Sequence, residues 1–183
     1  PKRETRGKIV DKSQVFTVKL SFVAALLEER HPKFALITRN PYASCYRAAS
    51  GKAGDMEYYQ GQLSFDERFQ ICVEHWSNAM QCAIEDSKEI QAEFRSFKFE
   101  DFLASPEETL RELCEFADIG FAMDLLPQPD DSLPLGSKYR NRWYPIRPEV
   151  NAKYLEEISL EQIATIEDYC GDLAASLGYQ PPN

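Results

Sequence analysis

The stretch Lys33-Phe34-Ala35-Leu36-Ile37-Thr38-Arg39-Asn40-Pro41 joins a strand to a helix, and the fold class follows from it. Residues 33–38 form a continuous apolar run, which is typical of a buried strand in a parallel sheet. Asn40 is a good N-cap and Pro41 a good first helical residue, so we expect a helix over residues 42–49. A strand that leads directly into a helix indicates an α/β domain.

The rest of the chain repeats this alternation of strands and helices. Ser105-Pro106-Glu107-Glu108 has the pattern of a capping box at the start of a helix. We expect further strands over residues 8–12 and 94–99, and further helices over residues 17–30, 64–89, 105–116 and 159–177. Residues 50–62 and 120–150 are expected to be irregular. The pattern predicts an α/β domain with a mainly parallel sheet.

Composition limits the classes of function. The chain has 183 residues, 43% of them hydrophobic, which fits one globular domain. The longest apolar stretch, residues 22–27, is too short to span a membrane, and no signal peptide is visible. Five scattered cysteines predict buried, reduced thiols rather than disulfides or a zinc site, so we expect a cytoplasmic protein without a metal. The net charge of −9 argues against nucleic acid or an anionic membrane as partners.

The charge is distributed unevenly along the chain. Residues 1–60 carry a net charge of +5 and residues 138–147 carry +4, whereas residues 61–137 carry −12. If the fold brings the two basic segments together, they form a site for an anion of several charges. The alternative is that they are unrelated solvated faces.

Arg39 is the first candidate site residue. Ligands of open α/β sheets bind at the carboxyl ends of the strands, and a helix that begins there presents free N–H groups to an anion. The guanidinium of Arg39 offers a planar donor fork for phosphate. Ser44 and Arg47 share a face of the following helix and are expected to reach the same anion. The alternative is that Arg39 pairs with a carboxylate while the other two are merely exposed.

Two further segments carry candidate cations. Lys138, Arg140 and Arg142 alternate with aromatic residues in an irregular segment, which could wrap a nucleotide by contacting phosphate and stacking on a base. The alternative is a basic surface loop anchored by Trp143. Lys12, at the end of the first expected strand, could stabilise negative charge that develops on a transferring group. An exposed pair with a neighbouring aspartate is the alternative there.

Taken together, these residues resemble the sulfotransferases that use 3′-phosphoadenosine 5′-phosphosulfate (PAPS). Four segments carry the resemblance in the order expected, over roughly residues 8–179. They are Asp11-Lys12-Ser13, Arg39-Asn40-Pro41 with the strand before it, Phe97-Lys98-Phe99-Glu100-Asp101-Phe102-Leu103, and the C-terminal helix through Leu177-Gly178-Tyr179. The resemblance implies a P-loop-like sulfotransferase fold, with a mainly parallel sheet flanked by helices.

The resemblance also implies roles for the candidate residues. Arg39 would bind the 3′-phosphate of PAPS, and Lys12 would lie near the transferring sulfuryl group. The position eight residues after Arg39 usually holds a serine in this family, but here it is Arg47. The 3′-phosphate would then be bound by both arginines, with Ser44 as an additional contact. The segment 138–142 would close over the nucleotide. Gln14 stands where some members have a catalytic histidine, and it cannot act as a base.

One element of the family pattern is missing. The strand, loop and helix that bind the 5′-phosphosulfate precede everything seen here, and residues 1–7 do not supply them. We therefore expect residues 1–183 to be a single domain that is incomplete at its N-terminus. The functional alternatives are a sulfotransferase acting on a hydroxyl or amine, and a non-catalytic nucleotide-binding or protein-interaction module. A truncated sheet would also expose an edge that favours a homodimer.

Overall fold

The computed structural model describes residues 8–52, 56–126 and 147–182. In chain order its elements are η1 (Gln14–Val18), α1 (Leu20–Leu26), η2 (Glu28–Arg30), β1 (Lys33–Thr38), α2 (Pro41–Arg47), η3 (Ala48–Lys52), α3 (Met56–Tyr59), α4 (Phe65–Glu89), β2 (Glu93–Lys98), α5 (Phe99–Ala104), α6 (Pro106–Phe116), η4 (Met123–Leu125), η5 (Pro148–Asn151), α7 (Ala152–Glu157) and α8 (Leu160–Ser176). The strands β1 and β2 pair in parallel, with Lys33 opposite Glu93 and Thr38 opposite Lys98. The predicted α/β class with a parallel sheet is therefore correct.

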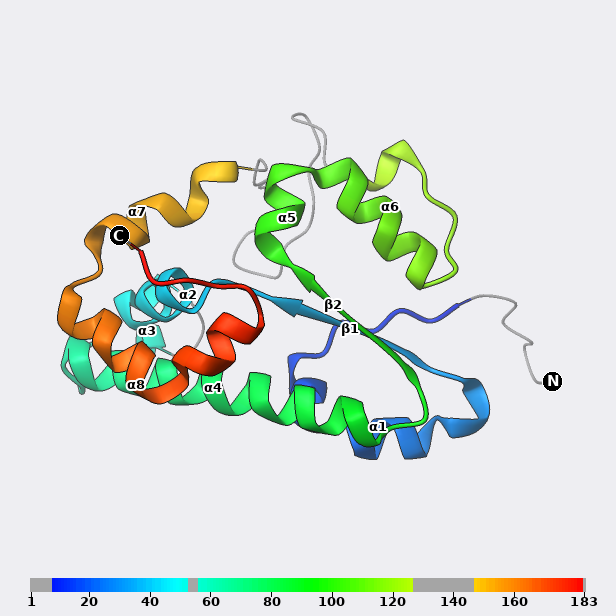
Figure 1. Cartoon of the computed structure of the whole chain (residues 1–183), viewed down its shortest axis with the longest axis horizontal. Coiled ribbons are helices and arrows are strands. Elements are labelled where there is room, and N and C mark those ends of the chain that lie inside the picture. The colour runs from blue at the N-terminus through cyan, green and yellow to red at the C-terminus, as the bar shows by residue number, and fades with distance from the viewer. Residues whose placement is uncertain (1–7, 53–55, 127–146, 183) are drawn as a thin grey trace.

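The two strands lie between layers of helices (Figure 1). On one face Leu36 and Phe94 pack in a cluster with Met80 of α4. On the other face the ring of Phe97 meets that of Phe116 in α6, with 6.0 Å between ring centroids. The parallel pairing requires a crossover between the strands, and α4 is the longest element of that crossover.

A second apolar cluster fixes α2 in place. Tyr42 and Cys45 of α2 pack with Val73 of α4 and Ile166 of α8, and all four are buried. Burying such side chains stabilises the fold by about 1.5–3 kcal/mol each for the larger ones. The joint between β1 and α2 is consequently held by three helices.

Helix starts follow the sequence at most positions. Asn40 caps α2 by accepting a hydrogen bond from the Ala43 N–H at 3.1 Å, with Pro41 in the first turn. Ser64 and Ser159 each form a complete capping box at the start of α4 and α8. The capping box expected at Ser105 is wrong, because the Ser105 side chain makes no cap hydrogen bond, although α6 does begin at the following proline.

The N-terminal region differs from its prediction. Residues 8–13 contain no strand, because no described strand lies beside them to complete a ladder. The helix expected over residues 17–30 is divided into η1, α1 and η2 by non-helical backbone at Lys19 and Leu27. Lys12 is therefore not placed at the end of a strand.

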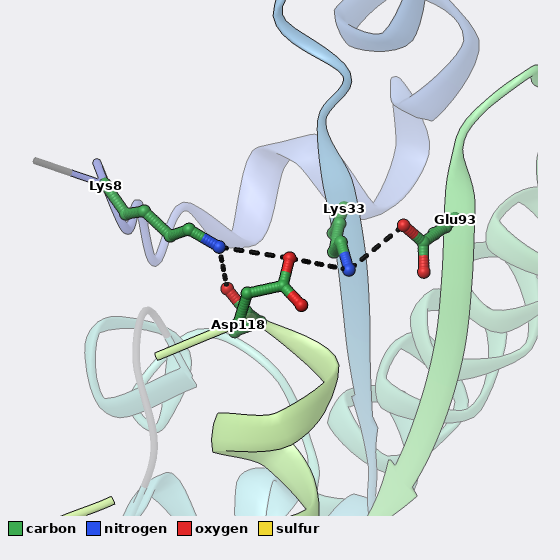
Figure 2. A network of polar contacts seen from close by, with 5 residues as sticks. Lys8, Lys33, Glu93 and Asp118 are labelled. Atoms are coloured by element: carbon green, nitrogen blue, oxygen red, sulfur yellow. Dashed lines mark hydrogen bonds and ion pairs between the residues drawn. The ribbon is translucent and has the colours of Figure 1, made fainter. Parts of the chain in front are cut away.

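Ion pairs attach this N-terminal region to the sheet and to α6 (Figure 2). The carboxylate of Asp118 lies between the ammonium groups of Lys8, at 3.1 Å, and Lys33, at 2.9 Å. Lys33 also pairs with Glu93 on the neighbouring strand at 3.0 Å. Lys8 donates in addition to the carbonyl of Ala117 at 2.8 Å, so it caps the C-terminal end of α6.

The strand β1 is buried on one face rather than on both as expected. Leu36 and Thr38 are 8% and 2% exposed, whereas Ile37 between them is 53% exposed. The reason is that α1 and α4 cover one face, while α6 covers the opposite face mainly over β2.

The five cysteines are all free thiols. Four of them are buried, and Cys82 is exposed. Burial raises the pKa of Cys72 and of Cys170 to about 11, so these thiols remain protonated and unreactive at neutral pH. None of the helices in the described ranges is long and apolar enough to cross a membrane.

Candidate functional site

Arg39 lies where β1 ends and α2 begins, at the carboxyl end of the sheet. Helix α4 helps to hold its backbone, because the indole N–H of Trp76 in α4 donates to the Arg39 carbonyl at 3.1 Å. The capped start of α2 follows immediately. The local sequence thus places a cation beside the N-terminus of a helix, which is an arrangement suited to an anion.

The guanidinium of Arg39 is oriented by neutral groups. Its Nε and Nη2 both donate to Oδ1 of Asn151, at 3.2 and 2.7 Å. Its carbon Cζ lies 4.9 Å from the centroid of the Phe99 ring. No carboxylate in residues 8–52, 56–126 or 147–182 forms an ion pair with it. The positive charge is therefore oriented but not neutralised by direct contact.

Arg47, the last residue of α2, adds a second cation. Burial lowers the pKa of Arg39, and the positive charge of Arg47 lowers it further. Arginine remains protonated in proteins despite such effects. Arg47 makes no ion pair with any described residue, and its charge acts on Arg39 against the weaker opposing effect of the Glu100 carboxylate. An anion of several charges would relieve the repulsion between the two arginines.

Ser44 occupies the same helix between the two arginines. Its Oγ is buried and makes no hydrogen bond within the described part of the chain. A buried hydroxyl without a partner is costly, and a bound water or ion is one group that can satisfy it.

Glu100, in the first turn of α5, connects the ends of both strands. Its Oε1 accepts hydrogen bonds from the Asn40 backbone N–H at 3.0 Å and from Nδ2 of Asn151 at 2.6 Å. Its Oε2 accepts from the Tyr179 hydroxyl at 3.1 Å. With three donors on one carboxylate, Glu100 serves as an anchor for α2, η5 and the C-terminal segment. The hydrogen bonds that Glu100 accepts come from these other segments and not from N–H groups of its own helix.

Tyr179 extends this network to the buried face of β1. It is 5% exposed, and its hydroxyl lies 2.8 Å from Oγ1 of Thr38. Burial raises the pKa of Tyr179, so the phenol stays protonated and continues to donate to Glu100. The residues around Arg39 therefore form one continuous hydrogen-bonded unit, Thr38–Tyr179–Glu100–Asn151–Arg39.

The structure brings together three of the predicted site residues, Arg39, Ser44 and Arg47. Lys12 is exposed, and no hydrogen bond or ion pair joins it to this group. Lys138, Arg140 and Arg142 lie outside the described residues.

Sequence reasoning missed Glu100, Asn151 and Tyr179 as members of the site. The sequence could have indicated Glu100, because it lies two residues after the end of β2 and the carboxyl ends of parallel strands meet at one edge of the sheet. Asn151 had none, because it lies in a short 3-10 turn 112 residues from its partner Arg39.

Grooves in the described part of the chain lie between α4 and α8 and along α6, away from Arg39. The groove between α4 and α8 has a volume of about 500 Å³ and is lined mainly by polar and acidic side chains. Arg39, Ser44 and Arg47 are not among its lining residues. Within the ranges that the structure describes, no three His, Cys, Asp or Glu side chains gather as metal ligands would.

Comparison with known proteins assigns the family. Residues 1–123, two thirds of the chain, match the sequence model described as "Sulfotransferase family". The chain belongs to the sulfotransferase family. No curated protein matches the chain in sequence.

A solved structure supports the sulfotransferase fold. The sulfotransferase domain from the curacin biosynthetic pathway superposes with a TM-score of 0.67 at 17% sequence identity. The alignment covers 97% of this chain and 65% of that one, so this chain spans 65% of the length of its structural neighbour. The predicted family resemblance is confirmed by the sequence match, and the predicted fold by the superposition.

Proposed function

We propose that this sulfotransferase binds PAPS through Arg39, Ser44 and Arg47 and takes part in moving its sulfuryl group to a hydroxyl or amine of an acceptor. The single observation that supports this most is the pair of arginines without a carboxylate partner beside the buried Ser44 hydroxyl. Phosphate accepts several hydrogen bonds and carries up to two negative charges, so a 3′-phosphate would satisfy both the cations and the hydroxyl.

The transfer needs positioning and charge stabilisation more than covalent chemistry by the protein. A nucleophilic oxygen or nitrogen of the acceptor attacks sulfur, the bond from sulfur to the phosphate oxygen breaks, and 3′-phosphoadenosine 5′-phosphate leaves. The acceptor proton passes to a base or to water. Glu100 is not proposed as that base, because its oxygens already accept three hydrogen bonds.

Lys12 and the basic segment complete the proposal. Lys12 would stabilise the charge that develops on the sulfuryl oxygens, and Lys138, Arg140 and Arg142 would close over the nucleotide. If so, Lys12→Gln should slow transfer from PAPS while leaving the affinity for the desulfated nucleotide unchanged. A Lys12→Gln chain with undiminished transfer would remove this residue from the mechanism.

The nucleotide site is tested by calorimetric titration of the chain. The ligands are 3′-phosphoadenosine 5′-phosphate and adenosine 5′-monophosphate, which lacks the 3′-phosphate. We expect tighter binding of the first and a loss of that preference in Arg39→Ala and Arg47→Ala, by roughly tenfold or more for each lost charged contact. Arg30→Ala is the matched control, since Arg30 is exposed just before the opposite end of β1.

Three results would argue against the proposal or against its catalytic part. Equal binding of the two nucleotides would show that no 3′-phosphate site exists. Absence of binding at millimolar nucleotide would favour the alternative function, an interaction module built on the sulfotransferase fold. Binding with the expected preference but without transfer to any acceptor would favour a non-catalytic nucleotide-binding module.

A further inference from the structure

The side-chain amide of Asn151 bridges a cation and an anion, Arg39 and Glu100. Its Oδ1 accepts both hydrogen bonds from Arg39, and its Nδ2 donates to Glu100 at 2.6 Å. Asn151 is 7% exposed and makes no other hydrogen bond through its side chain to a described residue. We propose that Asn151 is a positioning residue that aims the Arg39 guanidinium at the 3′-phosphate and keeps it from being neutralised by Glu100. This inference rests on the proposed function.

The first step of the argument concerns orientation. Two adjacent N–H groups of Arg39 converge on one oxygen, and the Phe99 ring lies 4.9 Å from the guanidinium carbon. A planar group held at one edge and beside a ring has little freedom to rotate. Nη1 makes no hydrogen bond to any residue in the described ranges, so it remains available to a ligand.

The second step concerns charge. Guanidinium and carboxylate groups form strong bidentate pairs when they meet directly, and such a pair would occupy the donors that a phosphate needs. Glu100 is near enough to raise the pKa of Arg39, against the larger lowering by burial. The amide of Asn151 separates the two charges while it satisfies both with hydrogen bonds.

The third step concerns the choice of side chain. The side chain at position 151 must be short, and it must accept hydrogen bonds from Arg39 and donate one to Glu100. An asparagine amide carries both, whereas aspartate offers only acceptors and alanine offers neither. The carboxylate of Glu100 cannot turn away from Asn151 without losing its other two hydrogen bonds, which come from Asn40 and Tyr179.

The test uses the full chain and the same two nucleotides. Asn151→Asp should place a negative charge against Arg39 and lower the preference for the 3′-phosphate by roughly tenfold or more. Asn151→Ala leaves the charge but releases the guanidinium, and should lower the preference by roughly three- to tenfold. Asn78→Asp, the same substitution at an exposed position of α4, should leave the preference unchanged.

The outcomes separate this inference from the proposed function. If Arg39→Ala abolishes the 3′-phosphate preference and both Asn151 variants keep it, the inference is overturned and the nucleotide site stands. If the wild-type chain has no such preference, the proposed function fails, and the inference with it. A purely structural role would lower the thermal midpoint of Asn151→Ala without changing the ratio of the two affinities, which also overturns the inference.

A measurement on the wild-type chain covers the case in which the variants fail to fold. The Nε–H of Arg39 donates to a buried amide oxygen, so its NMR signal should exchange with water slowly compared with that of Arg30. Exchange as fast as that of Arg30 would show that the guanidinium is not held and would overturn the inference.

Discussion

Tyr179→Phe removes one oxygen atom from the network that joins the C-terminal segment to the strand ends. The hydroxyl donates to Oε2 of Glu100 at 3.1 Å and lies 2.8 Å from Oγ1 of Thr38. Because its single proton is directed to the carboxylate, the Thr38 hydroxyl is the donor in the second contact. Phenylalanine keeps the buried ring and leaves both partners without this contact.

The expected loss of stability follows from these two bonds. A hydrogen bond to a charged group contributes about 1.5–3 kcal/mol, and a neutral one about 0.5–1.5 kcal/mol. In the variant the Thr38 hydroxyl can redirect its single proton to the Phe97 carbonyl, which is 3.4 Å away, and this long hydrogen bond offsets part of its loss. We therefore expect the free energy of unfolding to fall by about 2–3 kcal/mol. For a chain of this length that corresponds to a midpoint lower by roughly 4–12 °C.

Urea unfolding followed by tryptophan fluorescence measures this change. Tyr58→Phe is the matched control, since Tyr58 is 72% exposed and its substitution should change the free energy of unfolding by less than about 0.5 kcal/mol. A Tyr179→Phe chain that unfolds within about 0.5 kcal/mol of the wild type would refute the reasoning, because the partly buried Glu100 carboxylate would then not depend on this donor.

Two further substitutions test the site and the N-terminal attachment. Ser44→Ala should weaken binding of 3′-phosphoadenosine 5′-phosphate by roughly three- to tenfold without loss of thermal stability, because Ser44 Oγ makes no hydrogen bond within the described residues. Ser50→Ala should instead lower the thermal midpoint and spare binding, since Ser50 Oγ donates to the Tyr46 carbonyl at 2.8 Å. Lys33 and then Lys8 lower the pKa of Asp118 below 3.8, so its contribution to stability is present above that pH and is lost as the pH falls through the lowered value. Urea midpoints from about pH 6 to about pH 2 should therefore fall less steeply in Asp118→Asn, and parallel profiles would contradict the ion-pair account.

Local patterns predicted a large part of the fold correctly. The apolar run at 33–38, the N-cap at Asn40 and the helix starts expected at residues 64 and 159 each depend on residues within a few positions. Their elements form where expected because the deciding interactions are short-range. The strand expected at residues 8–12 is absent for the opposite reason, since a strand needs a neighbour and the sequence does not show whether one is present.

The candidate site divides in the same way. Arg39, Ser44 and Arg47 could be read from the chain because strand end, helix start and helical spacing place them together. Glu100, Asn151 and Tyr179 reach the same point from segments 61 to 140 residues farther along, and only the packing of α5, η5 and the C-terminal segment around the strand ends brings them there. Which groups hold the guanidinium, and that they are neutral rather than acidic, depends on those long-range contacts, which local sequence spacing does not encode.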